Sequence, residues 1–406
     1  MTDPHSAGLC PQRLARIRPA LEKHVHEQGM AGAVTLLARH GDVVDTQCVG
    51  YLDREAGLPM REDALFRIYS MTKPVACVAL MMLYERGHFQ LAEPLAKFLP
   101  AFADVLVHSD EGPVPPARPV TIRDLLTHTS GITYHFLENG PVEALYREQR
   151  VASDKPLAEF VDDIARQPLA FHPGTSWRYG FSHDVVARLV EVMSGQAFGD
   201  FLRDELFQPL GMVDTGFGVP TDKRERFAAM YGSHDVLEPE VSVSAWFGDA
   251  LAGKIRRLAG SDDSRELAAD PPGRGGHGLV STVRDYLQFC RMLAGGGSLD
   301  GRRYLGRKTL ALMTSNHIPG ELLPYEIGGI VTPGYGYGLG FRVMMDPAAA
   351  MLPGSPGEYG WSGAASTYFW IDPAEDFIGI QMAQFQPPGI HLLAPDFRVA
   401  AYQALL

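Results

Sequence analysis

Hydrophobic residues change their spacing along the chain, and these changes predict a series of helices and strands. Helical spacing predicts a first helix over 11–29. The next hydrophobic residues predict two strands, 33–37 and 43–49, on either side of the turn His40-Gly41-Asp42. A strongly apolar stretch then predicts a helix over 70–87.

Helices and loops dominate the middle of the chain, and strands return near its end. The expected elements are helices over 157–166, 184–194 and 198–207, a loop-like stretch over 236–274, strands over 336–344, 366–372 and 377–384, and a last amphipathic helix over 394–406. Because strands occupy both ends and helices the middle, we expect an α/β (α+β) fold. Residues 1–69 and 275–406 are predicted to form one discontinuous sheet domain, and 70–274 an inserted, mainly helical domain.

The chain is acidic, which restricts the partners that it can bind. Its 406 residues include 36 Lys and Arg against 48 Asp and Glu, a formal charge of −12 at pH 7. Non-specific nucleic-acid binding relies on Lys and Arg that neutralise phosphates, so no nucleic-acid partner is expected. The same balance predicts no attraction to an anionic membrane surface. The oligomeric state is left open.

The sequence shows neither a membrane-spanning segment nor a signal peptide, and we therefore expect a cytoplasmic location. The longest apolar run, 75–84, has ten residues, half of the roughly 20 that a membrane-spanning helix needs. The first 20 residues lack the apolar core of a signal peptide.

Four cysteines, at positions 10, 48, 77 and 290, lie far apart without a CxxC spacing and are expected to be free buried thiols. No metal site and no cofactor are predicted.

Ser70 and Lys73 form the most informative motif, at the start of the apolar helix. Residues three apart share a helix face, so the hydroxyl and the amine are expected side by side. A serine hydroxyl needs an adjacent base to act as a nucleophile, and lysine can serve when burial or nearby cations lower its pKa. The helix N-terminus disfavours the charged amine and favours an oxyanion. The motif alone is weak, since a capping serine before a solvated lysine gives the same letters.

Four further blocks follow the Ser70 motif in order, and together they carry a resemblance to a known family. The blocks are 66–73, 121–131, 173–179, 209–212 and 276–282. The set resembles the serine β-lactamase/penicillin-binding-protein superfamily in its class C-like branch. It most resembles the family VIII carboxylesterases, which are β-lactamase-like esterases, and it is also similar to statin side-chain acyltransferases. This resemblance implies an antiparallel sheet flanked by helices, with the active site in the cleft between the two domains.

The resemblance also implies roles for three side chains. Ser70 matches the nucleophile, Lys73 its proton-transfer partner, and Tyr179 a second base. A free tyrosine has a pKa of about 10, and a neighbouring lysine cation is expected to lower it. Which of Lys73 and Tyr179 takes the proton first is left open, because coupled groups share their titrations. By the same resemblance, the backbone N–H groups of Ser70 and Ala364 form the oxyanion hole.

Two positions depart from the β-lactamase pattern and indicate a different substrate. Where that pattern has an asparagine that holds the substrate amide, two residues after Tyr179, this chain has Phe181. Where it has a late Lys-Thr-Gly triplet, this chain has Trp361-Ser362-Gly363, so tryptophan replaces the lysine that faces a lactam carboxylate. Phe181, Trp361, Ser362 and Gly363 are therefore expected to bind the substrate, and an apolar ester is favoured over a carboxylate-bearing lactam.

A competing interpretation starts from the sequence around Ser362. Gly360-Trp361-Ser362-Gly363-Ala364 is similar to the G-x-S-x-G nucleophile elbow of α/β-hydrolases, with Asp372 or Asp376 and His391 following in the expected order. The elbow requires a helix after the serine, whereas a strand pattern follows here.

The favoured function is that of a serine carboxylesterase. It is predicted to hydrolyse small to medium carboxylic esters through a covalent acyl-enzyme on Ser70. The alternatives are an acyltransferase that uses an alcohol in place of water, a β-lactamase or D-alanyl peptidase, and a non-catalytic binder on the same fold. The intact set of Ser70, Lys73 and Tyr179 argues against the last.

Overall fold

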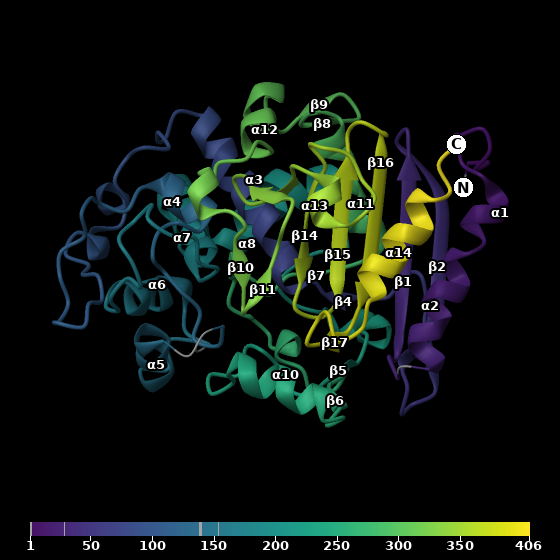
Figure 1. The fold of residues 1–406 in the computed structure, drawn as a ribbon, viewed down its shortest axis with the longest axis horizontal. Coiled ribbons are helices and arrows are strands. Elements are labelled where there is room, and N and C mark those ends of the chain that lie inside the picture. Colours follow the sequence, from purple (N-terminus) through teal and green to yellow (C-terminus); the bar gives the residue numbers. More distant parts are fainter. Residues whose placement is uncertain (1, 28, 138–139, 153) are drawn as a thin grey trace.

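An antiparallel sheet lies at the centre of the computed structural model, which describes residues 2–27, 29–137, 140–152 and 154–406 (Figure 1). Its strand order is β12-β13-β14-β15-β16-β1-β2-β3, and every neighbouring pair is antiparallel. The eight strands are β1 (Gly32–Arg39), β2 (Asp42–Asp53), β3 (Leu58–Pro59), β12 (Tyr335–Tyr337), β13 (Arg342–Met344), β14 (Tyr359–Gly363), β15 (Thr367–Asp372) and β16 (Phe377–Ala383). Ala33 on β1 pairs with Ala383 on β16, so the two ends of the chain share one sheet.

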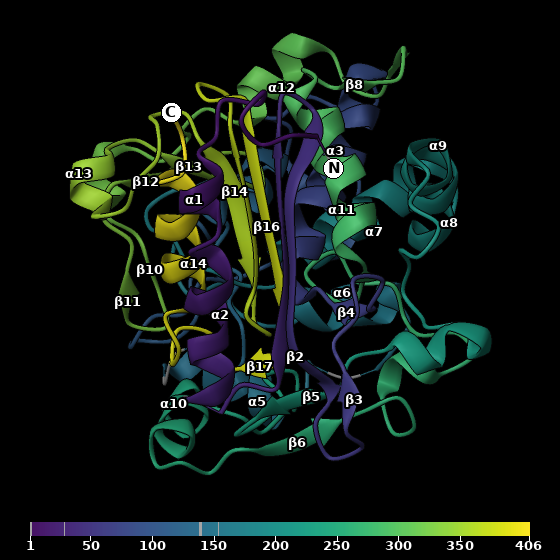
Figure 2. The ribbon, with the colours of Figure 1, turned by 90° about the vertical axis from the view of Figure 1, so that its right-hand side faces the viewer.

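Helices cover both faces of this sheet (Figure 2). One face carries α1 (Pro11–Leu14), α2 (Ile17–His26) and α14 (Leu393–Tyr402), and the other carries α3 (Thr72–Glu85) and α11 (Val283–Ala294). Each layer encloses its own apolar cluster, one around Trp370 and Phe397 and one around α3. Every side chain of α3 from Thr72 to Leu83 is buried, so this helix is the centre of the larger core.

The remaining elements lie mostly beside the sheet, with α4 to α8 on the left in Figure 1. The helices are α4 (Ile122–Thr127), α5 (Pro141–Glu148), α6 (Leu157–Ala165), α7 (Ser182–Ser194), α8 (Phe198–Leu202), α9 (Gln208–Leu210), α10 (Val243–Leu251), α12 (Arg307–Met313) and α13 (Pro347–Ala350). The short strands are β4 (Phe66–Arg67), β5 (Met230–Gly232), β6 (Arg256–Ala259), β7 (Val280–Ser281), β8 (Ser298–Leu299), β9 (Arg302–Arg303), β10 (Glu326–Ile327), β11 (Ile330–Val331) and β17 (Phe385–Gln386). The predicted α/β fold with an antiparallel sheet flanked by helices is confirmed, while the division into domains at residues 70 and 274 stays a prediction.

Three predicted elements differ from the structure, each for a local reason. The helix expected over 11–29 is split into α1 and α2, because Pro19 has no N–H and its ring excludes the carbonyl four residues before it. The strand expected over 336–344 is the hairpin of β12 and β13, where Gly340 (φ +92°) allows the chain to turn. The stretch 236–274, expected to be a loop, contains α10, whose first turn is capped by the Ser242 side chain.

The four cysteines are free thiols, as predicted, although only Cys77 and Cys290 are buried. In the part of the chain that the structure describes, no helix has the length and apolar character needed to span a bilayer.

Candidate active site

Ser70 lies in a short 3-10 turn, Tyr69–Met71, that leads from β4 into α3. Tyr69 adopts a left-handed conformation (φ +42°), which is strained for a residue with a bulky side chain. Its side chain is held at the far end, because the Tyr69 hydroxyl donates to Asp235 (3.2 Å) and accepts from the Gln386 amide (2.8 Å). These contacts fix the turn, so the Ser70 side chain stands at the N-terminal end of α3, as its sequence position predicted.

Lys73 is fully buried beneath Ser70 and makes three hydrogen bonds. Its Nζ lies 3.0 Å from Ser70 Oγ, 2.8 Å from Tyr134 Oη and 2.7 Å from the Gly276 carbonyl. The carbonyl can only accept, so a neutral amine donates to Gly276 and to one hydroxyl and still has a lone pair for the other. The arrangement therefore allows Ser70 to donate its proton to Lys73.

Burial controls the charge of Lys73. Removal from water disfavours the ammonium and lowers the Lys73 pKa to about 7, although the nearby carboxylate of Asp184 and the thiol of Cys77 oppose this change. Asp184 is itself buried, which raises its pKa, and it accepts a hydrogen bond from the Gly276 N–H (3.0 Å). A substantial fraction of Lys73 is thus the free amine at neutral pH, which a base requires.

Tyr179 lies just before α7 and faces Ser70 and Lys73. Lys73 Nζ stands 4.5 Å from the centre of its ring, and the Trp361 indole donates to its hydroxyl (3.2 Å). Burial raises the Tyr179 pKa above its ordinary value, against the opposing effect of hydrogen bonds to Ser70 and Trp361. The expectation that a lysine cation lowers this pKa was therefore wrong, because burial raises the Tyr179 pKa by more than its hydrogen bonds lower it. Tyr179 is a protonated phenol at neutral pH.

Tyr134 is the residue of this cluster that the sequence analysis placed in no role. Its hydroxyl bonds Lys73, and burial raises its pKa well above the ordinary value, so it too stays protonated. Its ring packs edge-on against Tyr179 and Phe181. The sequence contained one indication of this position, because Tyr134 lies three residues after the 121–131 block. An aromatic residue there is equally typical of a hydrophobic core, so the sequence alone does not assign it to the site.

The end of β14 is packed tightly against the turn that carries Ser70. A Cβ on Gly363 would lie 2.4 Å from the carbonyl oxygen of Ile68, so only glycine fits there. Thr367 on β15 donates to the same carbonyl (3.2 Å). This close approach brings Ser70 and Ala364, the predicted oxyanion-hole residues, to the wall of one cavity.

That cavity has a volume of about 410 Å³ and is lined mainly by apolar side chains. Ser70, Tyr179, Trp361, Ser362 and Gly363 line it together, so the structure gathers these predicted residues at one place. The apolar walls of the cavity come from loops and from elements that the hydrophobic pattern did not predict, including α10 and the β10–β11 hairpin. The apolar side chains in these walls include Phe136, Leu137, Val243, Trp246, Ile327 and Ile330.

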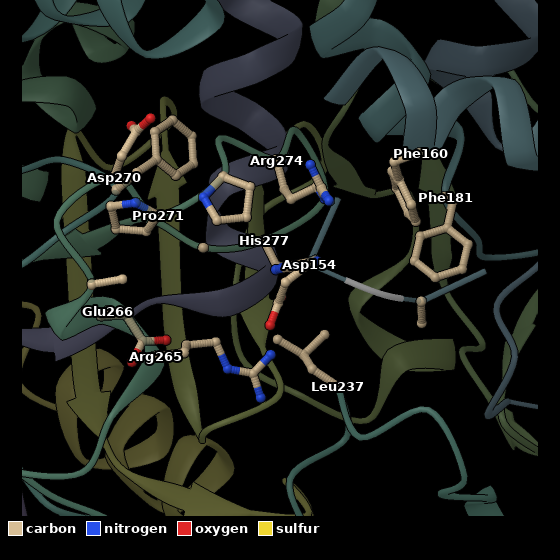
Figure 3. A pocket seen from close by; sticks show the side chains of 15 residues that line it. Asp154, Phe160, Phe181, Leu237, Arg265, Glu266, Asp270, Pro271, Arg274 and His277 are labelled. Carbon is tan, nitrogen blue, oxygen red and sulfur yellow. The ribbon is translucent and has the colours of Figure 1, made fainter. Parts of the chain in front are cut away.

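Phe181 does not reach the Ser70 cavity, in contrast to its predicted substrate-binding position. The first position of α7 follows it, and its ring is buried among Tyr134, Tyr146 and Phe160. It lines a neighbouring cavity of about 370 Å³, where Figure 3 shows it beside Phe160 and opposite His277. Because Tyr134 stands between Phe181 and Lys73, Phe181 shapes the site through packing.

The alternative nucleophile Ser362 lacks the surroundings of an elbow. It lies in β14, and the chain continues through a short turn into β15 instead of a helix. The two acids of the alternative triad have other partners: Asp372 accepts a hydrogen bond from the Tyr402 hydroxyl (2.8 Å), and Asp376 is bonded to His40 (2.9 Å).

Among the described residues, no three His, Cys, Asp or Glu side chains are grouped closely enough to hold a metal ion.

The sheet, its helical layers and the Ser70–Lys73 pair at the head of α3 define a serine hydrolase with a β-lactamase-like fold. The chain belongs to the beta-lactamase family, whose model matches residues 17–403. Esterase EstB of Burkholderia gladioli is 33% identical over 381 residues, which cover 92% of this chain and 91% of that protein. The lovastatin esterase of Penicillium rubens (strain ATCC 28089 / DSM 1075 / NRRL 1951 / Wisconsin 54-1255) is 29% identical over 350 residues, 80% of this chain and 81% of that protein.

Solved structures agree with the fold. EstCE1, described as a hydrolase with promiscuous acyltransferase activity, superimposes with a TM-score of 0.80 at 26% identity and covers 96% of this chain and 99% of its own. The predicted resemblance to the β-lactamase/penicillin-binding-protein superfamily, with likeness to family VIII esterases, is confirmed. The roles of the individual site residues and the cytoplasmic location stay predictions.

Proposed function

We propose that this chain is a serine carboxylesterase that forms a covalent acyl-enzyme on Ser70. The observation that carries the proposal is the bond between Ser70 Oγ and the buried Lys73 amine, whose pKa is lowered to about 7. An activated hydroxyl at the wall of a mainly apolar cavity suits an uncharged carbonyl substrate with apolar groups. The esterases among its relatives support the same reaction class.

In the proposed first step, Ser70 Oγ attacks the ester carbonyl and its proton passes to the free amine of Lys73. The N–H groups of Ser70 and Ala364 hold the oxyanion that forms. Collapse of this intermediate breaks the bond to the alcohol, which leaves with a proton from Lys73 or from the Tyr179 phenol. A water molecule then attacks the acyl-enzyme by the reverse proton route and releases the acid and free Ser70.

An acyltransferase is the second candidate, because only the group that attacks the acyl-enzyme differs. The structural similarity to EstCE1, which is described as a hydrolase with promiscuous acyltransferase activity, supports this second candidate. Product analysis with and without an added alcohol separates the two, since transfer gives a new ester while hydrolysis gives only the acid.

The test of the proposed function compares esters with a β-lactam. We expect Ser70-dependent hydrolysis of 4-nitrophenyl acetate, butyrate and octanoate with little turnover of nitrocefin, because Trp361 occupies the position of the family's lysine. Dominant nitrocefin hydrolysis would instead identify a β-lactamase. No turnover of either substrate or of an ester with an added alcohol would favour a binding protein.

The pH dependence of the reaction is expected to report the charge of Lys73. Only the free amine accepts a proton, so kcat/KM for the uncharged 4-nitrophenyl butyrate should rise with pH through a midpoint near 7, the value to which burial lowers the Lys73 pKa. Rates from pH 5.5 to 9, followed at the isosbestic wavelength of nitrophenol, check this.

Asp184→Asn is the matched control for this profile. The Asp184 carboxylate raises the Lys73 pKa against the effect of burial, so its removal should move the midpoint to lower pH. A profile that is flat below pH 8, or a midpoint that does not move in Asp184→Asn, would contradict the assignment of Lys73 as the base.

A further inference from the structure

His277 lies at the junction of the Ser70 cavity and the neighbouring cavity of about 370 Å³, because its side chain lines both. The backbone just before it is held from two sides. The Gly276 N–H donates to Asp184 (3.0 Å), and the Gly276 carbonyl accepts from Lys73 Nζ (2.7 Å). Figure 3 shows the imidazole among the side chains that line the neighbouring cavity. The ring therefore has a defined position close to the Lys73 amine.

The imidazole of His277 is neutral and has both ring nitrogens available. Among the described residues, neither nitrogen forms a hydrogen bond, although the side chain is partly buried. Burial lowers the pKa of this imidazole well below its ordinary value, and the charges of Arg274, Arg265 and Lys73 act in the same direction. A neutral imidazole donates from one nitrogen and accepts at the other. Each nitrogen can therefore bind a water molecule.

The neighbouring cavity gives water a route to this imidazole. Asp154 and Asp270 line it and are exposed, so the cavity reaches the solvent. Two of its charged side chains are matched within the chain, Arg265 by Asp235 (2.6 Å) and Glu266 by Arg67 (3.0 Å). A polar passage with paired charges is suited to water more than to one kind of ion.

The ester and the water have different sides from which to approach Ser70. The Ser70 cavity is lined mainly by apolar side chains, including those of α10 and the β10–β11 hairpin. An uncharged ester with apolar groups that fills this cavity displaces water from it. The side of His277 remains hydrated, because the polar cavity adjoins it there.

We propose that His277 binds the water molecule that hydrolyses the acyl-enzyme. The proposal rests on the proposed esterase function and adds a residue to its second step. The water oxygen attacks the acyl carbonyl and its proton passes to Lys73. The bond from the carbonyl carbon to Ser70 Oγ then breaks, and Ser70 regains a proton as the acid leaves. His277 keeps its own proton throughout and orients the water by a hydrogen bond.

The test separates the two halves of the reaction, because water takes part only after the alcohol has left. For 4-nitrophenyl butyrate, kcat/KM reports formation of the acyl-enzyme. Its hydrolysis is followed by intact mass, as decay of the butyryl-enzyme in a single-turnover mixture quenched with acid at timed intervals. We expect His277→Phe, which has a ring without polar atoms, to slow this decay by about 10- to 100-fold. The value of kcat/KM should fall by less than about threefold.

Further variants test whether hydrogen bonding at this position causes the effect. His277→Leu is smaller than His277→Phe and should slow the decay by a similar factor. His277→Gln keeps a donor and an acceptor, and its decay should stay within about fivefold of the wild-type rate. His88→Phe replaces an exposed histidine that lines neither cavity, and it should leave both rates unchanged.

The outcomes separate this inference from the esterase proposal. Equal decay in the wild-type protein and in His277→Phe or His277→Leu overturns the water site alone. A fall in kcat/KM as large as the slowing of the decay assigns His277 to the ester and also overturns it. Absence of Ser70-dependent hydrolysis of 4-nitrophenyl butyrate overturns the esterase function, and the water site with it.

Discussion

Replacing Ser70 with alanine is expected to lower kcat/KM for 4-nitrophenyl butyrate by about 10⁵-fold or more, because it removes the hydroxyl that lies beside the buried Lys73 amine and forms the proposed acyl-enzyme. Lys73 keeps its bonds to Tyr134 and Gly276 in this variant, so the fold and the lysine position should persist. Initial rates give the loss. Intact mass after treatment with an alkyl fluorophosphonate checks its cause, since wild-type protein should gain one adduct and Ser70→Ala none.

Ser362→Ala is the matched control, because it also removes one hydroxyl from the wall of the same cavity. It should lose less than about tenfold in kcat/KM, since Ser362 contributes at most contacts to the substrate. An inactive Ser362→Ala protein together with an active Ser70→Ala protein would overturn the assignment and restore the α/β-hydrolase interpretation.

The central sheet could be predicted where local pattern and tertiary contacts agree. The predicted strands 33–37 and 43–49 lie on either side of a turn at Gly41, and the structure has β1 and β2 there, joined by a turn in which Gly41 has a positive φ. The apolar run after Ser70 predicts a buried helix, and α3 is buried over most of its length. In both cases the secondary structure that the local sequence favours is also the one that the packing of the folded chain requires.

Elements whose shape depends on distant residues were harder to predict. Gly338 and Gly340 interrupt an otherwise strand-like run, and the structure turns there because Gly340 fits against Cys77 of α3. The helix α10 carries Trp246 into the Ser70 cavity, but its flanks are polar and mixed in charge, which is typical of a loop. Hydrophobic spacing alone contains no information on these contacts.

The candidate site divides in the same way. Ser70 and Lys73 are three residues apart on one helix, so their approach follows from local geometry. Tyr134 and Gly276 come from distant segments, and only the fold brings them to Lys73. Trp361 was placed correctly in the cavity by its match to a strand motif, whereas Phe181 was not, because Tyr134 occupies the space between.

Lys73→Met is expected to lower kcat/KM for 4-nitrophenyl butyrate by about 10³- to 10⁴-fold, which corresponds to the loss of general base catalysis at Ser70. Methionine fills the buried site with an unbranched side chain but cannot accept a proton. The Tyr179 phenol does not take over, because burial raises its pKa above the ordinary value. Circular dichroism and thermal melting establish that the variant is folded, and initial rates from pH 5.5 to 9 measure the effect.

The shape of the pH profile distinguishes Lys73 from its neighbours. Tyr179→Phe should lose about 10²- to 10³-fold through the missing hydroxyl, yet its rate should still rise with pH through a midpoint near 7, because Lys73 remains. Lys73→Met should lose that rise together with its activity. If Lys73→Met kept the midpoint near 7 while Tyr179→Phe lost it, the phenol would be the base, and the Tyr179 pKa in the free protein would have to lie near 7 and not above its ordinary value.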